Sequence, residues 1–139
     1  MRFHSDGQVV RGEFRPCPEH TGFQQVVHGG IISTVLDEIM VWACAVRTRQ
    51  FAFCAELTVR FQRPVHPGEL MIATAELVSN RRNRLFEAKA SLSYSTGVIA
   101  AVSTGKYLPI GEADREQLLT EFIGDVAPFR LPLPDPASA

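Results

Sequence analysis

Apolar side chains follow a helical period in one segment of the chain and a period of two in several others. Residues 30–46 carry the helical pattern, with apolar positions around nearly the whole circumference and interruptions at Ser33, Thr34, Asp37 and Glu38. A helix that is apolar on almost every side belongs in the interior of a protein. The sequence therefore predicts one long, buried helix.

The alternating segments predict an antiparallel sheet. Residues 51–63 alternate between apolar and polar side chains, which is typical of a half-buried strand. Further strands are predicted over 8–16, 69–79, 85–95 and 98–108, and the turns at 80–84 and 95–97 are short enough for hairpins. A sheet wrapped around the helix would cover the apolar surface of both, so the predicted class is α+β with five or six strands.

The remaining segments complete the predicted organisation. Residues 17–27 contain Pro18 and Gly22 and indicate a loop, and residues 112–122 predict a short amphipathic helix. From residue 128 onward the chain is rich in proline, so we predict one domain over residues 1–127 and a flexible tail over 128–139. The sequence contains no visible internal repeat.

Composition narrows the classes of function. A hydrophobic content of 45% supports a real core, and a formal net charge of −1 argues against a broad surface for nucleic acid or membrane. Arginine outnumbers lysine by twelve to two. Arginine suits bidentate contacts with phosphate or carboxylate, although a genome that favours arginine codons produces the same excess.

The cysteines and the apolar runs indicate the expected cellular location and whether a metal site or a membrane segment is expected. Three cysteines form an odd set, and no group of Cys or His residues has the spacing of metal ligands. Residues 1–7 lack the apolar stretch of a signal peptide, and the charges of Asp37 and Glu38 interrupt the longest apolar run. We therefore expect a cytoplasmic protein without a metal site or a membrane segment.

Two adjacent carboxylates interrupt the predicted buried helix. An unpaired carboxylate inside a protein is strongly unfavourable, so Asp37 and Glu38 each need a partner, water or a function. Neighbouring side chains on a helix diverge by about 100°, so the two cannot share one environment. From the helix alone, pairing with arginines or an exposed stripe would explain them equally well.

The helix is preceded by the turn His28-Gly29-Gly30. Two glycines allow close approach to the backbone, and the free N–H groups at a helix start favour negative charge. A thioester carbonyl oxygen that becomes an oxyanion is one group that could bind to these N–H groups. A flexible helix start would explain the glycine pair as simply, and a histidine at this position often caps the helix.

Together these residues resemble the signature of the hot-dog thioesterases, in particular the phenylacetic-acid-pathway (PaaI-like) group. The family pattern is His-Gly-Gly followed seven residues later by Asp or Glu on the central helix, and here it runs from His28 to Asp37. The similarity continues through residues 57–64, an alternating strand that ends in an aromatic-x-x-Pro turn, and through residues 100–105. It covers about residues 20–108.

The resemblance implies a hot-dog fold and an acyl-CoA thioesterase that needs no cofactor. The N–H of Gly29 would polarise the thioester carbonyl, His28 would orient the turn, and Asp37 would act as general base for water or as a nucleophile that forms an anhydride. In the family the site lies between two subunits, so the expected partner is a second copy, as a homodimer or a dimer of dimers. Further candidates for substrate contacts are Gly30, Glu38 and Cys54.

Two positions depart from the family pattern. Relatives place Asn or Gln six residues before the histidine, where this chain has Gly22, and Ser or Thr near position 54, where it has Cys54. A thiol is a poorer donor for holding water. These differences bear on the rate, and they keep open an alternative function as a non-catalytic acyl-CoA-binding protein. An enoyl hydratase of the same fold ranks lower, because its Asp/His pairing is absent.

The turn at residues 80–84 holds three arginines. In hot-dog enzymes the nucleotide of coenzyme A often rests against basic residues near sheet hairpins, so the resemblance makes Arg82 and Arg84 candidates for phosphate contacts. A solvated turn that keeps a sheet edge soluble explains them equally well. Arg60 and Arg63 are further candidates of the same kind.

Overall fold

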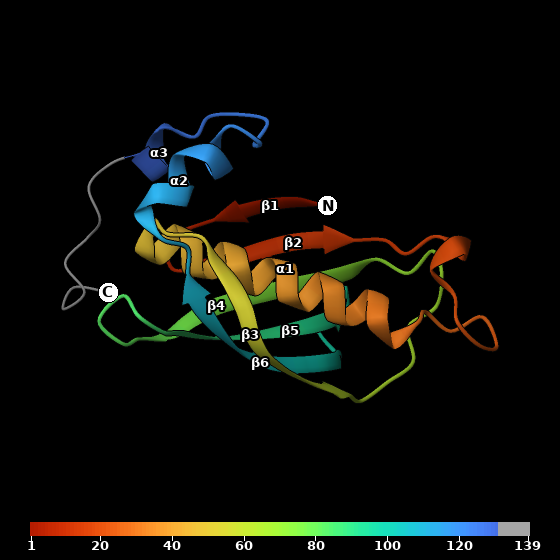
Figure 1. Cartoon of the computed structure of the whole chain (residues 1–139). Coiled ribbons are helices and arrows are strands. Elements are labelled where there is room, and N and C mark those ends of the chain that lie inside the picture. The colour runs from red at the N-terminus through yellow and green to blue at the C-terminus, as the bar shows by residue number, and fades with distance from the viewer. Residues whose placement is uncertain (131–139) are drawn as a thin grey trace.

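The computed structural model describes residues 1–130 (Figure 1). The long helix, the five strands and the short amphipathic helix predicted from the sequence are confirmed, whereas the first strand and the last helix were not predicted. In chain order the elements are β1 (Arg2–Ser5), β2 (Val9–Phe14), the 3-10 turn η1 (Pro18–His20), α1 (Gly29–Thr48), β3 (Ala52–Phe61), β4 (Met71–Asn80), β5 (Phe86–Tyr94), β6 (Ile99–Pro109), α2 (Glu112–Leu119) and α3 (Ala127–Arg130).

The strands form one antiparallel sheet of six strands, in the order β1-β2-β4-β5-β6-β3. The pairs β4–β5 and β5–β6 are the consecutive hairpins that the short turns predicted. The chain leaves the sheet after β2, runs through α1, and returns at the opposite edge as β3. The fold is therefore α+β, as predicted, with α1 flanked in sequence by strands that lie far apart in the sheet.

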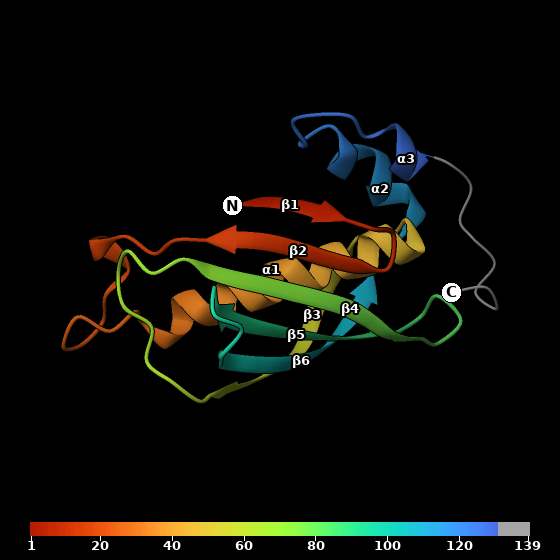
Figure 2. The ribbon, with the colours of Figure 1, turned by 180° about the vertical axis from the view of Figure 1, so that it is seen from behind.

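Helix α1 packs on one face of this sheet. Figure 1 shows α1 in front of β4 and β5, and Figure 2 shows the same strands in front of α1. Fully buried strand residues, including Met71, Phe86, Leu92 and Tyr107, fill the space beneath the helix. Each large apolar side chain buried in this way contributes about 1.5–3 kcal/mol to stability.

The helix is buried on one side, which corrects the prediction of a helix buried all round. Thr34 and Glu38 are exposed, and Val41 and Trp42 are half-buried, because the sheet covers one side of α1 and leaves the other partly open. By length and mean hydropathy (1.5) α1 also matches a membrane span. Nine of its residues are buried within this fold, which accounts for its apolar character.

Strand β3 forms one edge of the sheet and pairs with β6. Seven of its ten residues are exposed, so the half-buried strand predicted here is more open than its alternation implied. Phe53 and Phe61 are 67% and 51% exposed. An edge strand presents a row of unpaired backbone groups, and a long edge with exposed aromatic side chains suits pairing with another chain.

A β-bulge in β3 decides which of its side chains face the helix. Residues directly opposite in an antiparallel pair share a face, and Cys54 lies opposite Tyr107, which points toward α1. Ala55 is an extra residue, so Glu56 turns to the outer face. The sequence predicted one apolar face from residue 51 to residue 61, and the bulge makes this wrong at Phe53, which lies on the outer face.

Helices α2 and α3 pack near the C-terminal end of α1 through aromatic side chains. Phe51 stacks on Phe122 with 4.8 Å between ring centroids, and Trp42 meets both rings edge-on. Helix α3 includes the first residues of the segment predicted as a Pro-rich tail, and the rest of that segment, 131–139, lies outside the described residues.

Candidate active site

The turn before α1 leaves one main-chain donor free. His28 caps the helix, because its Nδ1 accepts from the N–H of Gly30 at 2.8 Å and its carbonyl accepts from the N–H of Ile31 at 2.9 Å. The N–H of Gly29 has no hydrogen-bond partner within residues 1–130. It stands at the positive end of the helix dipole, where a developing oxyanion is favoured.

Gly22 lies against the ring of His28. A Cβ at residue 22 would lie 3.0 Å from Cδ2 of His28, so a larger side chain would require the ring to shift. The Asn or Gln of the family pattern is therefore replaced here by space for the imidazole that caps α1.

An apolar hollow of about 370 Å³ lies beside Gly29. The ring of Phe61 approaches Gly29 so closely that an added Cβ would lie 3.2 Å from Cζ. The hollow can receive an apolar group next to the free N–H of Gly29. Most of its other lining residues are apolar as well: Val26, Val27, Ile32, Pro64 and Val65.

Asp37 lies half-buried in the middle of α1. The hydroxyl of Tyr107, a fully buried residue of β6, donates to its Oδ1 at 2.8 Å. One oxygen of the carboxylate is thus held from inside the protein, while the residue keeps part of its surface open. A carboxylate in this setting can take a proton from water or attack a carbonyl.

Cys54 lies beside this pair. Burial raises the pKa of its thiol, and the hydrogen bond and negative charge of Asp37 raise the pKa further. A thiol whose pKa is raised stays protonated and is a weak nucleophile. Cys54 is therefore a neutral neighbour of the carboxylate, brought there by the bulge in β3.

Glu38 lies apart from Asp37, as their divergence on the helix requires. It is exposed, and its Oε1 accepts from Nε1 of Trp42 at 3.1 Å, one turn further along α1. The structure does not bring Glu38 together with Gly29 or Cys54. Its hydrogen bond is a local one on the helix surface.

Arg82 and Arg84 are exposed on the hairpin between β4 and β5. Their neighbour Arg81 forms an ion pair with Glu87 at 2.9 Å. Figures 1 and 2 place this hairpin near the C-terminal end of α1, whereas the turn at Gly29 is at the other end. Within one chain, these arginines therefore do not share a site with Gly29.

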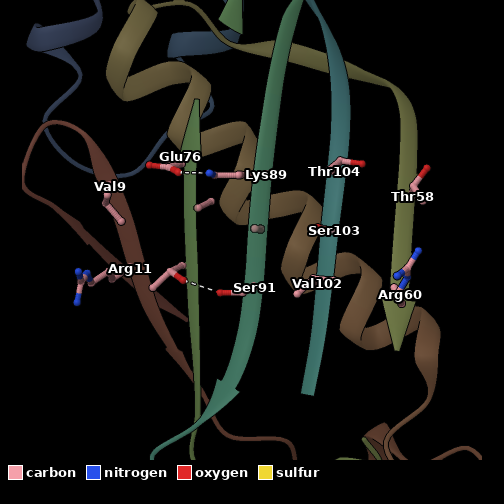
Figure 3. Close-up of a pocket in the computed structure, with 13 residues that line it drawn as sticks. Val9, Arg11, Thr58, Arg60, Glu76, Lys89, Ser91, Val102, Ser103 and Thr104 are labelled. Carbon is pink, nitrogen blue, oxygen red and sulfur yellow. Dashed lines mark hydrogen bonds and ion pairs between the residues drawn. The ribbon is translucent and has the colours of Figure 1, made fainter. Parts of the chain in front are cut away.

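A larger hollow, of about 590 Å³, lies on the face of the sheet opposite α1. Figure 3 shows Arg11 and Arg60 at its two sides and the ion pair of Lys89 with Glu76 (2.6 Å) between them, with α1 behind the strands. Asp37 is on the helix side of the sheet, so this hollow is separate from the site built on α1. Arg60, a phosphate candidate from the sequence, lies here.

The groups gathered around α1 suit chemistry at a carbonyl. They are a half-buried carboxylate, a free main-chain N–H, a phenol and a thiol. Among residues 1–130 no group of three or more His, Cys, Asp or Glu side chains is arranged to hold a metal ion. A carboxylate and an N–H donor are the parts that general-base and oxyanion catalysis require.

Known proteins share this fold and part of this sequence. Residues 24–87 match the family model of the thioesterase superfamily. The PaaI protein of the E. coli phenylacetic acid degradation operon is 20% identical, with 79% of each chain covered and a TM-score of 0.72. Zebrafish thioesterase superfamily member 2 is 21% identical over 78% of this chain and 80% of that chain, with a TM-score of 0.71.

A third structure, of a Streptococcus mutans UA159 protein bound to acetyl-CoA, is 14% identical over 78% of this chain and 87% of that chain, with a TM-score of 0.73. A comparison with curated proteins found no match. The fold is that of the hot-dog proteins. The match over residues 24–87 adds a sequence similarity to the thioesterase superfamily.

Sequence reasoning missed Tyr107, the donor to Asp37. A tyrosine in an alternating strand resembles an ordinary core residue, and its partner is 70 positions away in the chain. The one available signal was the spacing Gly105-x-Tyr107, which puts a glycine and a large ring on the same face of β6. Phe61 was likewise predicted as a strand residue, without its contact with Gly29.

Proposed function

We propose that this protein is an acyl-CoA thioesterase, which hydrolyses a thioester to a free acid and coenzyme A. The proposal rests on Asp37, a half-buried carboxylate held by Tyr107 on a helix whose first N–H is free. Similar proteins with bound acetyl-CoA or coenzyme A support this class of substrate. The chemistry uses a carboxylate, a main-chain amide and water.

The proposed reaction begins with the thioester carbonyl oxygen at the N–H of Gly29. Asp37 takes a proton from a water molecule as the water oxygen attacks the carbonyl carbon, and the oxyanion forms at the helix N-terminus. The C–S bond then breaks, and the departing thiolate receives the proton that Asp37 holds. Direct attack by Asp37, followed by hydrolysis of an anhydride, uses the same residues. The hollow beside Phe61 would hold an apolar part of the substrate.

The separation of Gly29 and Asp37 supports a site made by two chains. Eight residues along a helix span about 12 Å, which is too far for both groups of one chain to reach the same carbonyl carbon. Pairing of two copies through the exposed edge of β3, around a two-fold axis, would run the two α1 helices antiparallel. Gly29 of one copy would then work with Asp37 of the other, in a homodimer.

Thiol release from short, medium, long and aromatic acyl-CoAs tests the activity. We expect at least one ester to be hydrolysed well above the rate of Asp37→Asn, and coenzyme A to inhibit competitively. The alternative, a non-catalytic acyl-CoA-binding protein, is favoured by Gly22 and by the thiol of Cys54 in place of better donors. Binding of an ester without thiol release above that of the variant across the whole panel would select this alternative.

Mixing two inactive variants tests the shared site. Gly29→Pro removes the N–H donor, and Asp37→Asn removes the carboxylate. If each site takes one group from each chain, a mixed dimer has one intact site, and random exchange should restore about a quarter of wild-type activity. If both groups come from one chain, mixing restores nothing. Refolding the variants together and separately gives the matched comparison.

A further inference from the structure

Tyr107 is built into β6 in a way that directs its hydroxyl at one atom. Its side chain is fully buried, and its ring lies over Gly105, two residues earlier on the same face of the strand. A Cβ on Gly105 would lie 2.6 Å from Cε2 and 2.8 Å from the hydroxyl oxygen. Such a contact would force the ring to move, so Gly105 supplies the space in which the phenol reaches Asp37.

We propose that Tyr107 is a positioning residue for the reaction, which fixes the Asp37 carboxylate through Oδ1 and leaves the second oxygen to act on water or the thioester. This inference rests on the proposed function. A half-buried aspartate on a helix has several rotamers, and a donor at 2.8 Å that is itself immobile selects one of them. A fixed carboxylate loses no orientation freedom when the substrate binds.

The phenol remains a donor at every pH at which the protein would work. Burial raises the pKa of Tyr107 well above its usual range, and the hydrogen bond and charge of Asp37 raise it further. The other titratable groups that act on the Tyr107 hydroxyl are the thiols of Cys54 and Cys44. Tyr107 therefore donates to the carboxylate without losing its own proton.

Tyr107→Phe removes the hydroxyl and keeps the ring. We expect kcat to fall about tenfold, as for a lost hydrogen bond to a charged group, while KM stays within about twofold. In the Asp37→Asn background the same substitution should cause no further loss, because the two residues act as a unit.

Tyr94→Phe is the matched control. The hydroxyl of Tyr94 donates to the main-chain oxygen of Pro64, so this variant also loses one phenol hydrogen bond, but one that does not involve Asp37. It should lower kcat much less than Tyr107→Phe does. Gly105→Ala is the second probe, since it keeps the hydroxyl but displaces the ring, and it should reproduce the loss in kcat.

The results separate this inference from the proposed function. If the wild type is active and Tyr107→Phe keeps its kcat, the phenol serves packing alone and the inference is overturned. An additive loss in the Asp37→Asn background would overturn it as well. A wild type that releases no thiol from any ester would overturn the function and the positioning role together. Thermal unfolding of each variant identifies losses caused by misfolding.

Discussion

Asp37 and Glu38 are neighbours with the same charge, yet α1 places them in different surroundings. Asp37 is half-buried and accepts from a fully buried phenol, whereas Glu38 is exposed and accepts from Trp42 on the helix surface. An exposed carboxylate is screened by water, while a partly buried one interacts more strongly with its neighbours. Partners from distant strands, rather than position in the sequence, therefore give two adjacent carboxylates different surroundings.

The largest expected effect separates these two residues directly. Asp37→Asn keeps the shape of the side chain and removes its charge, so kcat/KM should fall at least about 100-fold, the usual contribution of a general base. Glu38→Gln should stay within about threefold of the wild type, because its hydrogen bond is on the surface. Thiol release from the best ester of the panel measures both. Equal losses would mean that Asp37 is not the catalytic carboxylate.

A second pair of variants tests the N–H at the start of α1. Gly29→Ala and Gly29→Pro both add a Cβ against Phe61, but only proline removes the N–H. His28 has ψ of 133°, which suits a residue before proline, and proline is well tolerated at the first position of a helix. We expect the proline variant to be about 100-fold slower than the alanine variant. Equal rates would remove the oxyanion role from this N–H.

The smallest expected effect uses Cys54 as a probe of the carboxylate beside it. Because burial and Asp37 raise the pKa of this thiol, its thiolate is scarce near neutral pH, and alkylation should be slower than in the unfolded chain and accelerate as pH rises. Asp37→Asn removes the negative neighbour, so alkylation should become about threefold faster. Glu38→Gln should leave it unchanged.

Mass spectrometry of the labelled peptides measures these rates. Cys44 provides an internal control, since it is fully buried and its pKa is raised to about 12. It should stay unlabelled in the folded protein. A rate at Cys54 that responds equally to both substitutions would contradict the separation of the two carboxylates.

Most of the fold could be predicted from periodicity, and what could not be predicted depended on tertiary contacts. The helical period of residues 30–46 and the alternation of the later strands are local patterns, and each predicts its own element. Strand β1 has four mostly exposed residues and forms by pairing with β2. No local sequence pattern predicts this strand. The bulge at Ala55 could not be predicted either, because the side chains around it alternate as in a regular strand.

Part of the candidate site could be predicted from the local sequence, and the rest depends on tertiary contacts. Asp37 was conspicuous because a carboxylate inside an apolar helix contradicts its surroundings, and the glycine turn gave it a chemical context. Tyr107 is an ordinary residue for a buried strand such as β6. The sequence therefore does not predict its contact with Asp37, which forms only in the folded chain. The position of Arg82 and Arg84, at the far end of α1, depends on the strand order, which hairpin lengths alone do not determine.

The bulge in β3 has a consequence for insertions and deletions. Cys54 and Glu56 face opposite sides of the sheet although they are two positions apart, because the bulge adds one residue to the strand. Removing Ala55 would leave a regular strand in which both side chains keep their present faces. Loss of a residue from a strand normally turns every side chain beyond it to the other face. Here, a chain shortened at this point would still present Cys54 to Asp37.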